Sequence, residues 1–372
     1  MKILMIHLDN NINKCPPAIN VMENLLEHGH EVFLISYNID ELNNEILSSK
    51  NFRYYDIGKR QDPKNNIKKY YLRLEVRNRV RKFVSAHIKQ YDFVWTTSDI
   101  TVREVGPILL QTKHVMELME LAQNVPMFGG HEQIRFDIAK YARHAYKVVV
   151  PEINRAYINK VWWGLDKLPT VLPNKPYRVE VPNASVEAQQ IINILKNEKR
   201  KILLYQGGFT EDRKFDVFAQ AIELLGDDYC LYFMGKDNNY RKEICKKYPF
   251  IKYVGCLNPP EHLLIAKYAY IGILTYVPIK VGFYSELNAL YCAPNKTYEY
   301  ALCNLPMIGT DVLGLREIFD KFGVGVCINE PTPQGVVEAV KYVSEHYNTM
   351  KVNCKKYYDS VDLDKIVENI LN

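Results

Sequence analysis

The chain has 372 residues, a length that suits two domains better than one core. Hydrophobic residues make up 47% of the chain and charged residues 24%, which is ordinary for a globular protein. The eight cysteines show no C-x-x-C pair and no Cys/His cluster, which argues against a structural zinc site and a disulfide framework. No stretch reaches the about 18 apolar residues of a membrane span. We read residues 1–8 as a strand rather than a signal peptide, because Asp9 ends the apolar run, and we expect a cytoplasmic protein.

The net charge of +5 is unevenly distributed. Residues 59–89 contain 11 basic and two acidic residues, a local charge of +9, so the rest of the chain sums to −4. A concentration of this kind predicts a basic surface feature in this segment.

The first half of the chain alternates between strand and helix patterns. Residues 3–6 form a continuous apolar run, residues 19–28 show helical spacing, Gly29 ends that helix, and residues 31–36 form the next strand. This order is a βαβ unit. Further strands are expected at 93–96, 115–118, 147–150 and 170–172.

The segment 173–201 changes character, with three prolines followed by a polar helix at about 185–197, and we interpret it as the connection between domains. A second alternating series follows, with strands at 202–205, 230–234, 253–254, 271–276, 307–308 and 324–328 and a helix at 215–225. The fold class is therefore α/β, with two doubly wound Rossmann-like domains facing across a ligand crevice. We place the domains at 1–174 and 175–344, and expect 345–372 to be a helical segment that returns to the first domain.

The stretch around Pro294 reads as a loop, a short helix and a buried strand. Pro294 leads into the helix, which carries Asn295, Lys296 and Glu299 near its start, and Pro306 opens the strand. A helix N-terminus beside a sheet edge offers free N–H groups and positive charge to an anion. This pattern predicts a cradle for a nucleoside diphosphate joined to a sugar.

With these residues in view, the chain resembles the two-domain GT-B glycosyltransferases, and most closely the retaining branch called family four. The resemblance covers nearly the whole chain. The motifs that carry it are, in chain order, Gly29-His30-Glu31-Val32, Pro173-Asn174, Gly207-Gly208, Arg213, Ala221, Gly235, Pro294-Asn295-Lys296, Glu299, Pro306, Gly314 and Glu317.

The resemblance implies a nucleoside-diphosphate sugar as the donor substrate, no metal and no further cofactor. It implies that Arg213 and Lys296 bind the departing diphosphate, and that Glu299 binds the ribose hydroxyls. The other residues expected in the donor site are Gly207, Gly208, Asn295, Thr297 and Tyr276. The acceptor, a cell-surface glycan or a lipid-linked sugar, belongs to the first domain.

Three positions depart from the family pattern. Tyr291 stands where many relatives have a first glutamate, Met119-Glu120 replaces a His-Asp pair, and Gly208 replaces an arginine. A catalytically inactive scaffold subunit of this fold, or a nucleotide-sugar epimerase, is therefore an alternative. Arg213 also has a simpler interpretation as a surface residue paired with Asp212 or Glu211, and Lys296 as a solvated loop lysine.

The basic segment contains a helix at 68–89. Its apolar residues fall near one face and a row of arginines lies beside them: Leu72, Val76, Val80 and Phe83, then Arg73, Arg77 and Arg81. One interpretation is a solvated helix packed on its own domain. The other is adsorption to an anionic membrane surface on its inner face, as a peripheral protein. We expect no nucleic-acid partner, because no recognition motif accompanies the charge.

Overall fold

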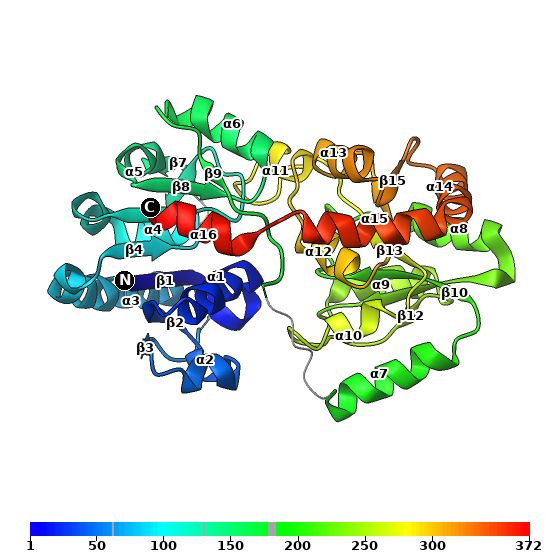
Figure 1. The fold of residues 1–372 in the computed structure, drawn as a ribbon, viewed down its shortest axis with the longest axis horizontal. Coiled ribbons are helices and arrows are strands. Elements are labelled where there is room, and N and C mark those ends of the chain that lie inside the picture. The colour runs from blue at the N-terminus through cyan, green and yellow to red at the C-terminus, as the bar shows by residue number, and fades with distance from the viewer. Residues whose placement is uncertain (62, 129–130, 178–183) are drawn as a thin grey trace. The chain divides into compact units, whose positions relative to one another are not determined.

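The computed structural model describes residues 1–372 except for residues 62, 129–130 and 178–183. The side chains of residues 131 and 132 are also not described. The missing ranges include part of the expected interdomain connection, which lies outside the described residues. The chain divides into two compact units, each built on one parallel β-sheet (Figure 1), so the expected α/β class is confirmed. The first unit comprises Met1–Pro173, Gly282–Ser285 and Asp362–Asn372, and the second comprises Asn174–Val281 and Glu286–Val361.

The first unit contains a seven-stranded sheet with the order β3-β2-β1-β4-β5-β8-β9. Its strands are β1 (Lys2–Asn11), β2 (Glu31–Tyr37), β3 (Phe52–Asp56), β4 (Phe93–Thr96), β5 (His114–Glu117), β8 (Lys147–Val150) and β9 (Thr170–Val171). β1 is central because its apolar run, residues 3–6, is fully buried and pairs with β2 on one side and β4 on the other. The strand order changes direction between β1 and β4, which is where doubly wound sheets bind ligands.

The helices of the first unit follow the expected alternation. They are α1 (Pro16–Glu27), α2 (Asn44–Ser48), α3 (Asn66–His87), α4 (Asp99–Val105), α5 (Ile138–His144), α6 (Ile153–Trp163) and α16 (Leu363–Leu371). α1 begins three residues before the expected start, because Pro16 and Pro17 occupy its first turn, where a missing N–H is tolerated. None of the helices in the described ranges combines the length and apolar character needed to cross a bilayer.

Two strand features of the first unit were not predicted from the sequence. β3 is an edge strand whose residues are largely exposed apart from Phe52, so it lacks an apolar run. The hairpin β6 (Val125–Phe128) and β7 (His131–Phe136) stands apart from the main sheet as a two-stranded antiparallel pair.

The second unit contains a six-stranded parallel sheet with the order β12-β11-β10-β13-β14-β15. Its strands are β10 (Lys201–Gln206), β11 (Tyr229–Met234), β12 (Lys252–Tyr253), β13 (Ile271–Leu274), β14 (Met307–Thr310) and β15 (Gly325–Ile328). Alternate residues of β10 serve two separate cores: Leu204 packs into one and Leu203 and Tyr205 into the other. Both faces of this sheet are therefore covered, and the order changes direction between β10 and β13.

The helices of the second unit are α7 (Val186–Asn197), α8 (Asp216–Leu225), α9 (Asn239–Lys247), α10 (Leu263–Ala266), α11 (Leu287–Leu290), α12 (Asn295–Leu302), α13 (Leu313–Phe322), α14 (Pro333–Glu345) and α15 (Tyr347–Asp359). We expected the returning segment to start near residue 345. In the structure α15 belongs to the second unit, where the ring of Tyr357 stacks on that of Tyr298 at 4.6 Å, and the part in the first unit starts at Asp362.

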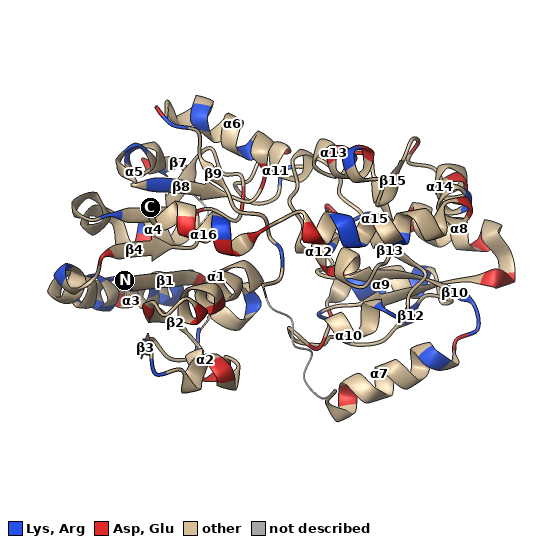
Figure 2. Cartoon of the chain, viewed as in Figure 1, with Lys and Arg blue, Asp and Glu red and all other residues tan. Residues whose placement is uncertain are grey.

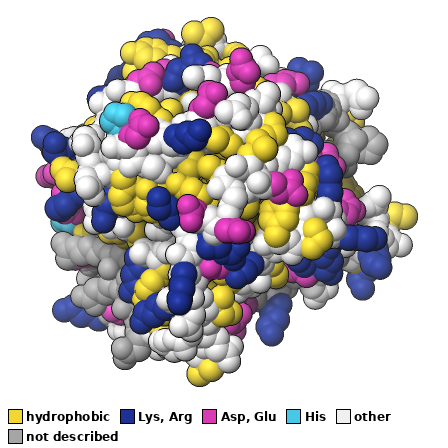
Figure 3. Space-filling model, turned by 90° about the vertical axis from the view of Figure 1, so that its right-hand side faces the viewer, with side chains coloured by type: hydrophobic (Ala, Val, Ile, Leu, Met, Phe, Trp, Pro, Cys, Tyr) yellow, Lys and Arg dark blue, Asp and Glu magenta, His cyan; other side chains and the backbone are white. Residues whose placement is uncertain are grey.

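The charge distribution follows the sequence locally. Lys and Arg positions recur along α3 (Figure 2), as its composition requires. On the face drawn in Figure 3, basic and acidic side chains are intermixed with hydrophobic ones, so the charge on that face is not of one sign.

Candidate functional site

The candidate donor site lies in the second unit, at the carboxyl end of β10, where the strand order changes direction. Gly207 follows β10 with a φ of 146°, and a Cβ there would lie 2.7 Å from Nζ of Lys296. A Cβ on Gly235, which follows β11, would overlap the carbonyl oxygen of Gly207. Gly235 is therefore required for the close approach of the two turns, and the positive φ of Gly207 favours glycine there. The Lys296 side chain lies over the turn that leaves the sheet.

Lys296 is the second residue of α12, which begins after Pro294 in an extended conformation. Burial lowers the pKa of Lys296, and the charge of Arg213 lowers it further, whereas Glu299 opposes the shift. No hydrogen bond or ion pair of its ammonium group is found among the described residues. A half-buried cation between another cation and a carboxylate is well suited to bind an anion.

Arg213 lies in the loop between β10 and α8. Its guanidinium carbon stands 3.9 Å from the centroid of the Tyr276 ring, and it forms an ion pair with Asp212. The hydroxyl of Tyr240 donates to its carbonyl oxygen at 2.7 Å, which fixes the backbone. Burial works to lower the pKa of Arg213, but Tyr276, Tyr205 and Asp212 outweigh it and raise the pKa, so the side chain stays charged. Arg213 therefore forms an ion pair with Asp212 and also lies close enough to Lys296 to influence its pKa, so the two interpretations of Arg213 are compatible.

Glu299 lies further along α12 and is 7% exposed. Its Oε1 is 3.2 Å from Nε2 of His262, the residue before α10. Burial acts to raise the pKa of Glu299, but the hydrogen bond from His262 and the charge of Lys296 outweigh it and hold the pKa below its usual value. Glu299 is therefore an ionised hydrogen-bond acceptor, opposite in charge to Lys296 and Arg213. It is available to hydroxyl donors.

Gln206 is the last residue of β10, and its side chain is 2% exposed. Neither the oxygen nor the nitrogen of its amide has a hydrogen-bond partner among the described residues, although the amide lies near enough to Glu299 to help lower the pKa of that carboxyl. Nδ1 of His262 is likewise buried without a partner in the described part of the chain. Buried polar atoms of this kind are costly unless a ligand or water pairs with them.

The structure brings most of the expected donor-site residues together, but not all. Gly207, Arg213, Tyr276, Lys296 and Glu299 converge as described above, and Asn295 opens α12 in a half-buried position.

Thr297 and Gly208 do not join this group. The Thr297 hydroxyl is buried, donates to the carbonyl oxygen of Pro294 at 3.0 Å and lies 3.2 Å from the hydroxyl of Tyr357, so its contacts are internal. Gly208 is exposed, with nothing within 4 Å of the place of a Cβ. Its carbonyl oxygen accepts a hydrogen bond from Tyr205 at 2.5 Å, which is a backbone role open to other residues.

Sequence reasoning missed Gln206 and His262. A signal existed for Gln206, because it is the polar residue that ends an apolar strand immediately before Gly207. His262 gives no such signal, because it follows an ordinary loop and meets Glu299 only through the packing of α10 beside α12.

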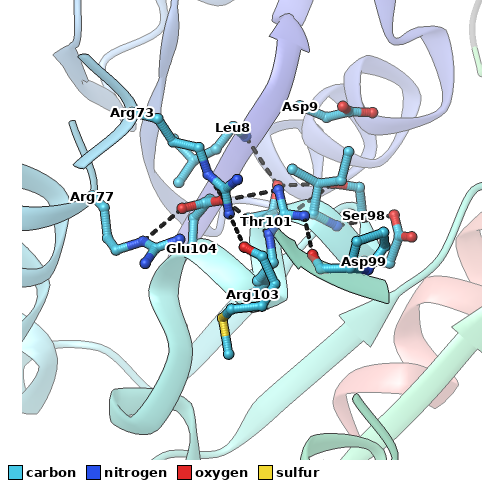
Figure 4. Close-up of polar contacts among 12 residues, drawn as sticks. Leu8, Asp9, Arg73, Arg77, Ser98, Asp99, Thr101, Arg103 and Glu104 are labelled. Atoms are coloured by element: carbon cyan, nitrogen blue, oxygen red, sulfur yellow. Dashed lines mark hydrogen bonds and ion pairs between the residues drawn. The ribbon is translucent and has the colours of Figure 1, made fainter. Parts of the chain in front are cut away.

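The arginine row of α3 lies in the first unit and faces inward (Figure 4). Nε of Arg73 is 2.7 Å and Nε of Arg77 is 2.8 Å from the two carboxylate oxygens of Glu104, on α4. Arg103 adds a third ion pair to this carboxylate at 2.9 Å, and Nε of Arg81 donates to the Glu104 backbone oxygen at 2.8 Å. Of the two interpretations of this row, the contacts favour a helix packed on its own domain, because Glu104 binds Arg73 and Arg77 through its buried carboxylate and Arg81 through its backbone oxygen.

No protein-family model matches the chain, and a search of curated proteins finds no match. Solved structures match along the whole chain at low identity. The HepE protein of Anabaena, in complex with UDP and glucose, is 12% identical with a TM-score of 0.67, over 98% of this chain and 97% of that one. Sucrose-phosphate synthase of Thermosynechococcus elongatus is 15% identical with a TM-score of 0.65, over 100% and 95%.

A Listeria monocytogenes protein assigned as a UDP-N-acetylglucosamine 2-epimerase is 12% identical with a TM-score of 0.61, over 100% of this chain and 95% of that one. At these identities the likeness establishes the fold: the chain has the GT-B fold of two Rossmann-like domains.

Proposed function

We propose that this protein is a glycosyltransferase that moves a sugar from a nucleoside-diphosphate donor to a cell-surface glycan or lipid-linked acceptor, with retention of configuration and without a metal ion. The observation that carries the proposal is the position of Lys296 over Gly207, with Arg213 and Glu299 beside it. The carboxyl end of a central strand is the place where a doubly wound domain binds a nucleotide. The structural neighbours solved with UDP and with UDP-glucose support the choice of donor.

The chemistry follows from these charges. When the anomeric C–O bond breaks, negative charge grows on the departing diphosphate, and fixed cations at that point lower the barrier. Lys296 supplies a point charge, and Arg213 a planar fork placed over the Tyr276 ring. Glu299 accepts hydrogen bonds from the ribose hydroxyls. In the retaining branch that the sequence resembles, the diphosphate itself takes the acceptor proton, so no protein base is assigned.

The test is a transfer assay with radiolabelled nucleoside-diphosphate sugars, an acceptor lipid extract and a chelator in a parallel reaction. We expect label in the extract, release of nucleoside diphosphate, no loss of rate with the chelator, and an anomeric linkage by NMR that matches the donor. Arg213→Lys should retain more activity than Arg213→Ala, because the charge is kept and only the fork is lost. Transfer that stops on chelation, or a product of opposite anomeric configuration, contradicts the corresponding part of the proposal.

The same assay separates the alternatives. The epimerase alternative is favoured by the Listeria neighbour, and predicts an isomerised donor without transfer. A scaffold subunit, which Tyr291 in place of a glutamate favours, predicts donor binding without turnover.

We also propose peripheral attachment to the inner face of a membrane, through the exposed N-terminal part of α3 rather than through its arginine row. Ile67 and Tyr71 are 68% and 67% exposed, and Lys68 and Lys69 beside them are exposed. Apolar and aromatic side chains flanked by lysines suit an anionic bilayer surface. Sedimentation with phosphatidylglycerol vesicles should fall in Ile67→Ser/Tyr71→Ser, but not in Tyr157→Ser, a control that is 57% exposed on α6. Equal sedimentation of all three proteins contradicts the attachment.

A further inference from the structure

Three carboxylates gather in the first unit at the carboxyl ends of neighbouring strands. Asp9 lies near the end of β1, Asp99 follows β4, and Glu120 follows β5. β1 pairs with β4, and β4 with β5, so these residues lie around the point where the strand order changes direction. The carboxylates of Asp9 and Asp99 both lie on the side of Thr101 away from Glu104 (Figure 4).

Asp99 is the most deeply buried of the three, with 3% of its surface exposed. Its Oδ1 accepts a hydrogen bond from the N–H of Ile100 at 2.9 Å, and the Tyr284 hydroxyl lies 3.5 Å away. Its Oδ2 is buried and has no hydrogen-bond partner among the described residues. An unmet acceptor in such a place is expensive to keep unless a ligand donates to it.

The neighbouring polar groups are already paired with one another. His7 contacts the Thr97 hydroxyl at 2.7 Å and the Asn10 side-chain oxygen at 3.1 Å, and the Thr101 hydroxyl accepts from the Leu8 N–H at 3.0 Å. Asp99 Oδ2 is therefore the acceptor in this set that is left to meet a ligand.

The electrostatic environment is negative. Burial raises the pKa of Asp99 to about 7, and the charges of Asp9 and Glu120 add to the rise, while the Ile100 N–H and the charge of Arg103 oppose it. The same carboxylates face Tyr284, whose pKa they and burial raise. Phe283 and Tyr284, whose ring centroids are 4.2 Å apart, pack against the core of this unit next to the carboxylates. In the described part of the chain, no group of three or more His, Cys, Asp or Glu side chains is arranged to hold a metal ion.

We propose that Asp9, Asp99 and Glu120 form the acceptor subsite, and that it takes a neutral or amino-bearing sugar ring and rejects a ring that carries a carboxylate or phosphate. Ionised carboxylates accept hydrogen bonds from hydroxyl and ammonium groups, whereas an acidic ring brings like charges together in a site of low dielectric. The inference rests on the proposed glycosyltransferase function and adds the charge class of its acceptor.

The test is saturation-transfer NMR titration of the full chain in the presence of UDP, with three probes: methyl glucoside, methyl glucosaminide and methyl glucuronide. We expect the neutral and amino glycosides to bind, and the glucuronide to bind at least about tenfold more weakly than they do. At about pH 8, above the pKa of about 7, Asp99 is ionised, and Asp99→Asn should weaken binding of the amino glycoside by about tenfold, since a charged hydrogen-bond acceptor is replaced by a neutral one. The control variant is Asp166→Asn, on the exposed surface of the same unit, which should bind as the wild type does.

UDP binding, measured by calorimetry, distinguishes a failure of the acceptor subsite from a failure of the proposed function. Asp99→Asn should leave the Kd for UDP unchanged, because the donor residues lie in the second unit. Should Asp99→Asn fail to fold, Asp9→Asn, at a half-exposed position, serves the same purpose. Glucuronide binding equal to glucoside binding, wild-type affinity in both variants, or no glycoside binding while UDP binds would overturn the subsite. A wild type that does not bind UDP would instead count against the proposed function.

Discussion

Nε2 of His262 lies 3.2 Å from Oε1 of Glu299, and the two side chains are 15% and 9% exposed. Because this contact joins the start of α10 to α12, it holds the carboxylate in place from outside its own helix. Replacing His262 with alanine should reduce the free energy of unfolding by about 1.5–3 kcal/mol, the cost of leaving a buried charged acceptor short of a partner. Urea unfolding measures it, and a loss below about 0.5 kcal/mol would show that the pair contributes little.

The same carboxylate predicts a pH dependence of stability. Burial acts to raise the pKa of Glu299, but His262 and Lys296 hold it below its ordinary value of 4.5. Its contribution to stability is therefore present above that value and is lost as the pH falls through the lower pKa of the folded state. Between about pH 5 and pH 3, the free energy of unfolding should fall more steeply in the wild type than in Glu299→Gln. Glu338→Gln, at an exposed position on α14, should keep the wild-type slope.

Lys296 should contribute to donor binding through its charge. Lys296→Ala is expected to raise the Kd for UDP by about tenfold or more, because a charged contact to phosphate contributes about 1.5–3 kcal/mol. The matched variant is Lys341→Ala, an exposed lysine of α14, for which calorimetry should return the wild-type Kd. Identical affinities in the two variants would remove Lys296 from the diphosphate site.

Gly207 and Gly208 are adjacent, but alanine should destabilise the fold at Gly207 and have little effect at Gly208. A Cβ at Gly207 meets the Lys296 side chain, and the φ of 146° is strained for any other residue, so Gly207→Ala should destabilise the fold by about 1–3 kcal/mol. Gly208 has open space at the same point, and Gly208→Ala should lie within about 0.5 kcal/mol of the wild type. A tolerated Gly207→Ala would contradict the strain expected from this backbone conformation.

Glu104 should be a sensitive position in the first unit. It binds Arg73, Arg77 and Arg103, so Glu104→Gln leaves buried guanidinium groups without their anion and should cost about 3–5 kcal/mol. Glu75, which is 62% exposed and 4.0 Å from Arg79 on the same helix face, provides the control. Glu75→Gln should change the unfolding free energy by less than about 0.5 kcal/mol.

Local pattern predicted most of the elements. The apolar run at 3–6 and the Gly29 stop define β1, α1 and β2 without help from tertiary contacts, and the run at 202–205 does the same for β10. The edge strand β3 escaped because exposed Arg53, Tyr54 and Asp56 mask its pattern.

The site was harder to predict, because its contacts are non-local. The sequence pointed separately to Gly207 and Lys296, but their approach depends on α12 packing at the end of β10, some ninety positions away. The α3 arginines show the same limit. Helical spacing placed Arg73 and Arg77 on one row, while the direction of that row was decided by Glu104, about thirty residues later.

The return of α16 means that the first unit is completed by the far end of the chain (Figure 1). Ile370 and Leu371 are buried there, the Asn24 amide donates to Asp364 at 2.6 Å, and the Tyr146 hydroxyl donates to the carbonyl oxygen of Asn372 at 2.8 Å. A fragment cut after Pro173 would leave the apolar side of α1 uncovered and prone to aggregation. Residues 363–371 must therefore be made before this unit can close, and a truncation that removes α16 would damage the unit whose strands are made first.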